Sequence, residues 1–158
     1  NLVEWVVERL HRQGLEPVVV TNEQLFEEML ESVGCEVICN PDPESGRTGT
    51  VQLGIRRIGL APGRRFLIVP VDRPGFSDST LSTLLAAHAT ACPASGGRGG
   101  HPLLLSEEDA ARILKVAPSE PLRDLVEPER IEVSDPHLHL NVDTPEDIER
   151  MIRVAGNL

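Results

Sequence analysis

Helical and strand-like patterns alternate along this chain, and the alternation constrains the fold more than any other feature of the sequence. Apolar residues at helical spacing mark a first helix over residues 2–10, and short apolar runs at 17–20 and 36–39 are typical of buried strands. Further strands are expected at residues 66–71, 131–133 and 138–142. Further helices are expected after Thr21, near Val51, after Asp78 or Ser79, after Ser106 and after Thr144. Strands separated by helices predict an α/β fold with a mostly parallel sheet.

Length, charge and cysteine usage narrow the functional classes. The 158 residues fit a single domain spanning 1–158, and a formal charge of −10 argues against nucleic acid as a partner, because phosphate backbones are bound by clustered Lys and Arg. No apolar stretch approaches the ~20 residues of a membrane span, so we expect no membrane partner. Three scattered cysteines do not make a disulfide framework, and a reduced, cytoplasmic setting is expected.

The strongest candidate for chemistry is Asp72, which lies between Pro70 and Pro74 at the end of an apolar run. One interpretation is a polar turn residue that closes a strand. The other is a carboxylate held at a strand tip, where parallel α/β sheets place their ligands. A carboxylate in that place is a natural ligand for Mg²⁺ that is shared with substrate phosphates.

A second acidic segment, residues 140–147, divides into a structural half and a candidate functional half. Thr144 followed by Pro145 and two acidic residues is typical of a helix start, so we assign residues 145–147 to structure. Asn141 and Asp143 are alternate residues that project to one side of an extended segment. With Asp72 they are predicted to complete a metal site.

Two glycine-containing loops are weaker candidates. Residues 45–50 (SGRTGT) separate a strand from a helix, and their amides and Arg47 are suited to an anionic or nucleotide group, although the spacing is not that of a P-loop. Residues 94–100 (ASGGRGG) predict a flexible loop that closes over a substrate or merely connects two elements. His137 and His139 alternate like zinc ligands but have no evident third ligand, so we assign them no metal role.

Taken together and in order, these segments resemble the MobA-like nucleotidyltransferases. The resemblance is carried by the apolar-Pro-Val-Asp72-Arg-Pro segment, the GRTGT loop, the Gly100-His101-Pro102 segment and the NVDTPED segment that begins at Asn141. The family includes guanylyl- and cytidylyltransferases of molybdenum-cofactor synthesis and related enzymes that act on sugar phosphates. The resemblance covers nearly the whole chain.

The resemblance implies a three-layer α/β/α Rossmann-like sandwich of the nucleotide-diphospho-sugar transferase type. It implies the transfer of a nucleoside monophosphate from an NTP, GTP or CTP, to a phosphorylated acceptor with release of pyrophosphate. Asp72 would hold a catalytic Mg²⁺, completed by Asn141 or Asp143. Gly46, Arg47, Thr48 and Gly49 would face the nucleotide, and Gly100, His101 and Pro102 would lie toward the acceptor.

The family's Leu-Ala-Gly-Gly-type loop, which cradles the triphosphate, is not in the sequence, so we expect an N-terminally truncated domain. A missing strand would leave sheet edges that favour pairing, and a homodimer is therefore expected. The alternative is a non-catalytic, regulatory module that binds a nucleotide or small molecule and has lost the phosphate-binding loop. A third interpretation is an unrelated Rossmann-like enzyme with Asp72 as a nucleophile.

Overall fold

The computed structural model describes residues 1–158, except the side chain of Asn157, and the chain forms two compact units. The first unit contains residues 1–66 and 106–127, and the second contains residues 67–105 and 128–158. The chain first passes from one unit to the other within strand β3 (Phe66–Ile68). Each unit is described by itself.

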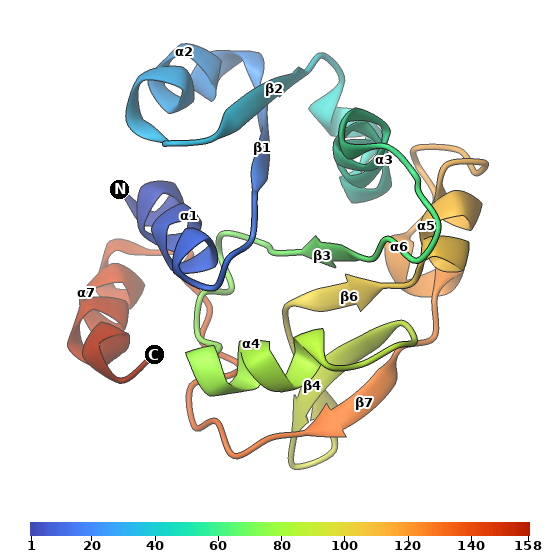
Figure 1. Ribbon diagram of the computed structural model, residues 1–158. Coiled ribbons are helices and arrows are strands. Elements are labelled where there is room, and N and C mark those ends of the chain that lie inside the picture. Colours follow the sequence, from blue (N-terminus) through green and yellow to red (C-terminus); the bar gives the residue numbers. More distant parts are fainter. The chain divides into compact units, whose positions relative to one another are not determined.

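The first unit is built on two parallel strands, β1 (Val18–Asn22) and β2 (Glu36–Asn40), which pair in register from Val18 opposite Glu36. Helices α2 (Glu23–Ser32) and α3 (Arg47–Ile58) pack against this pair (Figure 1). The other elements of the unit are α1 (Leu2–Arg12), the 3₁₀ turn η1 (Pro43–Ser45), α5 (Glu107–Ile113) and α6 (Leu122–Leu125). The helix–strand alternation read from the sequence is confirmed here.

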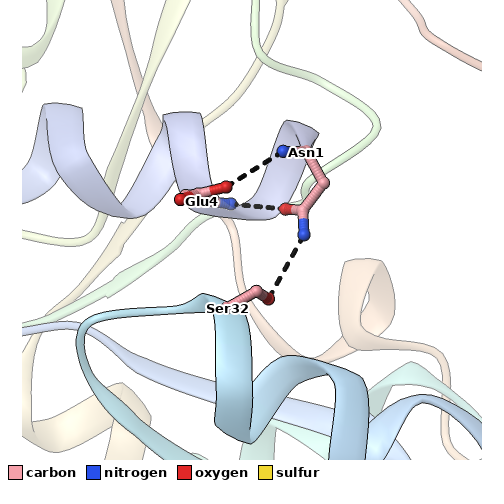
Figure 2. Close-up of polar contacts among 3 residues, drawn as sticks. All are labelled: Asn1, Glu4 and Ser32. Atoms are coloured by element: carbon pink, nitrogen blue, oxygen red, sulfur yellow. Dashed lines mark hydrogen bonds and ion pairs between the residues drawn. The ribbon is translucent and has the colours of Figure 1, made fainter.

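Asn1 both caps α1 and connects it to α2 (Figure 2). Its Oδ1 accepts a hydrogen bond from the Glu4 amide at 2.8 Å, and the Glu4 carboxylate accepts one from the Asn1 amino group at 3.1 Å. The Asn1 Nδ2 donates to Ser32 Oγ, in the last turn of α2, at 3.2 Å. The cap therefore satisfies an open helix amide and also fixes α1 against its neighbour.

Gln52 joins α3 to α5 inside the first unit. Its side chain is 1% exposed, and its Nε2 donates to the carbonyl oxygens of Ile113 at 2.8 Å and Val116 at 2.9 Å. Carbonyls at the end of a helix have no partner within that helix, so a buried amide side chain supplies one from outside.

The second unit is organised around strand β4 (Ala91–Ser95). β4 pairs in parallel with β7 (Glu129–Glu132) along one edge, and antiparallel with β5 (Arg98–Gly99) and β6 (Leu103–Leu105) along the other. β3 pairs with β6 and completes a five-stranded sheet, and α4 (Asp78–Leu85) packs on β4 (Figure 1). The last helix is α7 (Pro145–Val154), followed by the 3₁₀ turn η2 (Ala155–Asn157).

Several sequence-based boundaries are wrong, each for a local physical reason. The strand expected over residues 66–71 ends at Ile68, because Pro70 has no amide to continue the ladder. Residues 138–142 contain turns rather than a strand. α2 is capped by Asn22, whose Oδ1 accepts from the Leu25 amide, and α4 by Ser77. The sheet of the second unit includes the antiparallel pairs β4–β5 and β4–β6 beside the parallel pair β4–β7.

The glycine-rich segment 94–100 is a β-hairpin instead of the expected flexible loop. Gly96 and Gly97 have φ of 59° and 76°, which are left-handed values that the two central residues of a tight hairpin turn require. Ser95 pairs with Arg98 across the turn, and the Gly96 and Gly97 amides donate to the Glu132 carboxylate on β7. Gly96 and Gly97 therefore form a defined hairpin turn.

No helix among the described residues has the length and apolar character needed to cross a membrane.

Replacing Gln52 with Leu keeps the side chain buried but leaves the Ile113 and Val116 carbonyls without their donor. We expect the free energy of unfolding to fall by about 1–3 kcal/mol, the cost of unsatisfied buried acceptors. Urea unfolding followed by circular dichroism measures this. Gln24→Leu, the same change at an exposed position of α2, is the matched control. Equal unfolding midpoints for the two variants would contradict the assigned role of Gln52.

Candidate functional site

Asp72 lies on a tight turn directly after β3. The Arg73 amide donates to the Pro70 carbonyl oxygen at 3.1 Å, which closes the turn and places Val71 and Asp72 at its tip. The Asp72 side chain is 35% exposed, and its Oδ2 lies 3.7 Å from Arg73 Nε. The proline before the turn therefore ends the strand and presents a partly exposed carboxylate beyond it.

The second acidic segment lies beside this turn. The Val142 amide donates to the Asp72 carbonyl oxygen at 2.9 Å, so the backbone of residues 141–143 is hydrogen-bonded to the tip that carries Asp72. Asn141 Nδ2 donates to Asp143 Oδ2. Asn141 Oδ1 is buried and, within the described part of the chain, has no hydrogen-bond partner. The two segments predicted to share a site are thus neighbours in the second unit.

Asp135, which the sequence reading missed, holds the surrounding loops together. It is 5% exposed, and its Oδ2 accepts from the Ser77 amide at 2.7 Å and from Thr80 Oγ1 at 2.9 Å. Its Oδ1 accepts from the His137 amide at 3.2 Å. One buried carboxylate therefore connects the start of α4 to the loop that leads to Asn141. The available signal was an Asp-Pro pair directly after a strand pattern.

Two backbone segments approach so closely at position 75 that only glycine fits there. A Cβ atom built at Gly75 would lie 1.9 Å from the His137 carbonyl oxygen and 2.7 Å from the Leu140 Cβ. No side chain fits there, so residues 137–140 pack directly on the chain that follows Asp72. This packing brings the two acidic segments within hydrogen-bonding distance.

A small hollow of about 170 Å³ lies in the same unit. Its lining residues come from three segments of the chain: Arg73, Arg98, Gly99, Gly100, His101, Leu138 and His139. The structure therefore brings Gly100 and His101, expected near the acceptor, together with the residue that follows Asp72. The His101–Pro102 peptide is cis, and Pro102 is buried.

The other predicted nucleotide-facing residues are in the first unit. Gly46, with φ of 114°, precedes α3, and Arg47 is the exposed first residue of that helix. Thr48 is 1% exposed, and its hydroxyl donates to the Glu120 carbonyl oxygen at 2.5 Å. Gly49 is buried against Pro118. No side chain in the described structure caps the N-terminus of α3, and residues 118–120 pack against its first turn.

A larger hollow of about 850 Å³ lies elsewhere in the first unit, at the amino ends of β1 and β2. Its lining residues include His11, Cys35, Glu36 and Arg57, and none of the predicted site residues. Ligands of parallel α/β sheets bind at the carboxyl ends of the strands, so size alone does not make this hollow the site.

Thr144 and Asp147 form the predicted helix start. The Thr144 hydroxyl and amide donate to Asp147 Oδ2, the Asp143 amide also donates to it, and the Asp147 amide donates back to Thr144 Oγ1. The hydrogen bond from the Thr144 side chain, with smaller effects that include the Asp143 amide, lowers the pKa of Asp147 below its ordinary value. The assignment of residues 145–147 to structure is confirmed.

Chemically, the Asp72 tip and residues 141–143 offer carboxylate and amide oxygens, the ligand types that hard divalent cations prefer. Among the described residues, no three His, Cys, Asp or Glu side chains cluster closely enough to hold a metal ion by themselves. Any metal held here must therefore also use the Asn141 amide or oxygens of a substrate.

The chain was compared with protein families, with proteins of curated function and with solved structures. Residues 1–137 match the model of the MobA-like NTP transferase domain family. Proteins of curated function gave no significant match. Solved structures with similar folds include three that cover nearly the whole chain.

Rv0371c of Mycobacterium tuberculosis, in a complex with manganese, has a TM-score of 0.77 at 14% identity, covering 97% of this chain and 86% of that chain. The molybdopterin-guanine dinucleotide biosynthesis protein A of Archaeoglobus fulgidus has a TM-score of 0.64 at 18% identity, covering 100% and 87%. A 4-diphosphocytidyl-2C-methyl-D-erythritol synthase has a TM-score of 0.72 at 16% identity, covering 98% and 90%. These likenesses confirm the predicted α/β fold.

Gly75→Ala tests the packing that joins the two acidic segments. The added methyl group meets the backbone of His137, so residues 137–140 must shift, and we expect a loss of about 1–3 kcal/mol in the free energy of unfolding. Urea unfolding measures it. Gly34→Ala is the control, since a Cβ there meets nothing within 4 Å. A Gly75→Ala protein as stable as the Gly34→Ala protein would exclude the close approach.

The depressed pKa of Asp147 predicts acid-sensitive stability. A carboxyl group with a lower pKa in the folded state stabilises the fold above its unfolded-state pKa of about 4, and this contribution is lost as the pH falls through the folded value. Urea midpoints measured from pH 7 down to pH 3 should therefore fall more steeply for the wild type than for Asp147→Asn. Glu149→Gln, an exposed change on α7, should retain the wild-type pH dependence. Identical pH dependence in the wild type and Asp147→Asn would contradict the prediction.

Proposed function

The chain belongs to the family of MobA-like NTP transferase domains, and from this premise we propose that it transfers a nucleoside monophosphate from an NTP to a phosphorylated acceptor. An oxygen of the acceptor phosphate attacks the α-phosphorus and forms a new P–O bond. The bond between the α-phosphorus and the bridging oxygen breaks, and pyrophosphate leaves with the electron pair. Little covalent chemistry is required of the protein, which acts by positioning and charge neutralisation.

The observation that carries the proposal is the 2.9 Å hydrogen bond from the Val142 amide to the Asp72 carbonyl oxygen. It joins two acidic segments that are distant in sequence and that the family resemblance assigns to one metal site. A turn residue with a purely local role would not need a second acidic segment bonded to its backbone.

The residues present fit a divalent cation. Asn141 Oδ1 is a buried acceptor without a partner among the described residues, and an unsatisfied buried oxygen is costly unless something binds it. Asn141 donates its amide hydrogen to Asp143, which leaves that oxygen free to coordinate. Asp72 and Asn141 would hold the cation, and Asp143 would orient the Asn141 amide. When bound, a Mg²⁺ or Mn²⁺ ion would neutralise phosphate charge at this place.

The nucleotide is assigned to the residues at the start of α3. The amides after Gly46, which no described side chain caps, and the exposed guanidinium of Arg47 are suited to phosphate oxygens or to polar edges of a base. Thr48 and Gly49 contribute backbone and packing, since the Thr48 hydroxyl already donates within the protein. GTP or CTP is the proposed donor, and a molybdopterin-related phosphate is one candidate acceptor. A cytoplasmic location and a homodimer remain part of the proposal.

Asp72→Asn tests the proposed metal site. The amide retains the size of the side chain but loses the negative charge, so the gain in NTP affinity that Mg²⁺ or Mn²⁺ provides should fall about tenfold or more. Isothermal titration calorimetry of the four NTPs, with either metal and with EDTA, measures this gain. Asp124→Asn, an exposed change on α6, should behave as the wild type.

Unchanged metal-dependent binding by Asp72→Asn would contradict the metal role. NTP binding by the wild type that is followed by no release of pyrophosphate with any phosphorylated acceptor would instead support the non-catalytic binding module.

A further inference from the structure

Helix α7 leaves a ridge of apolar side chains exposed. Ile152 is 66% exposed and Ile148 is 49% exposed, and these are the two most exposed large apolar side chains of the described residues. The two isoleucines lie four residues apart on the helix, so they are neighbours on one face. Exposed apolar side chains that adjoin one another, unlike scattered ones, indicate an interaction surface.

The same helix is anchored within the second unit. Met151 is 6% exposed, so the side of α7 that carries it is covered. The helix begins at the reciprocal hydrogen bonds of Thr144 and Asp147, and just beyond its end the Leu158 carbonyl oxygen accepts from the Asp78 amide at 3.3 Å. The isoleucine ridge is therefore presented by a helix held at both ends, and a preformed surface binds a partner without first ordering the chain.

A ridge of two opposite charges runs beside the isoleucine ridge. Glu149 directly follows Ile148, and Arg153 directly follows Ile152, so the two charged side chains are also four residues apart. Both are exposed, and neither forms an ion pair with another described residue. This edge of α7 is therefore acidic toward the start of the helix and basic toward its end.

Such an edge is complementary to a second copy of itself turned end for end. Antiparallel pairing of two α7 helices about a two-fold axis sets Ile148 against the partner's Ile152, and the reverse contact repeats it. The same pairing sets Glu149 against the partner's Arg153, again twice. Parallel pairing would instead bring Glu149 beside the partner's Glu149, so the charges select one orientation.

We infer that the exposed edge of α7 docks on the α7 of a second copy of this chain, antiparallel and about a two-fold axis. The inference gives the proposed homodimer a contact surface other than an open sheet edge, and it does not depend on nucleotidyl transfer. A helix of 10 residues is only about 15 Å long, so the contact is small and of the transient class. Association is therefore reversible and depends on protein concentration.

Charge reversal tests the pairing, with the self-association of the full chain measured by sedimentation equilibrium over a range of concentrations. Glu149→Arg and Arg153→Glu each set like charges against one another, so each should weaken the dimer about tenfold or more. The double variant restores opposite charges and should dimerise as the wild type, as should an equal mixture of the two single variants. Arg150→Glu, the same change on the opposite side of the helix, should leave the dimer unchanged.

Ile152→Ser tests the apolar half of the contact. It should also weaken the dimer about tenfold or more, because the side chain leaves water only in the dimer. Ile58→Ser, at an isoleucine of α3 that is 42% exposed, should not weaken it. Circular dichroism of each variant should show the helix content of the wild type.

Three outcomes would overturn the inference. A wild type that stays monomeric at every concentration would exclude a second copy as the occupant of this edge. A dimer that Arg153→Glu and Ile152→Ser leave intact would place the contact elsewhere, such as at a sheet edge. Failure of the double variant to dimerise would exclude the antiparallel pairing. Calorimetry of NTP binding with Mg²⁺ tests the proposed function separately, since a dimer broken by Arg153→Glu in a protein that binds no NTP would support the α7 contact and overturn the nucleotidyl transfer.

Discussion

The second unit depends on one backbone contact, the hydrogen bond from the Val142 amide to the Asp72 carbonyl oxygen. This bond forms only if residues 137–140 lie directly on the chain after Asp72, which the absence of a side chain at Gly75 permits. Asp135 fixes the same loop from the other side through its bonds to the Ser77 and His137 amides. The close backbone approach at Gly75 and the hydrogen-bonded, buried carboxylate of Asp135 together hold residues 135–140 in place.

The charges of this unit are ordered around that contact. Carboxylate and amide oxygens from Asp72, Asn141 and Asp143 gather beside the turn, and the basic hollow begins at the next residue, Arg73. In the proposed transfer, a cation beside Asp72 would offset phosphate charge. The proposed transfer therefore rests on this arrangement of charges.

Periodicity predicted the elements well and their ends poorly. The helices around Val51 and after Thr144 follow from spacing and capping residues, which act locally. The end of β3 at Ile68 and the hairpin at Gly96–Gly97 were mispredicted, although Pro70 and the paired glycines carry the physical cause. Asp72 and Asn141 were predicted to be close, because their motifs are recognisable as a pair. Asp135 was missed, since its role comes from contacts between segments that no single motif encodes.

The central claim is that Asp72 and Asn141 hold one divalent cation together. The most direct measurement is anomalous diffraction from crystals of the full chain grown with Mn²⁺ and an NTP. The account predicts an anomalous peak within coordination distance of both the Asp72 carboxylate and Asn141 Oδ1, with nucleotide phosphate as a further ligand. A manganese peak that contacts neither side chain, in crystals where the nucleotide is bound, would contradict it.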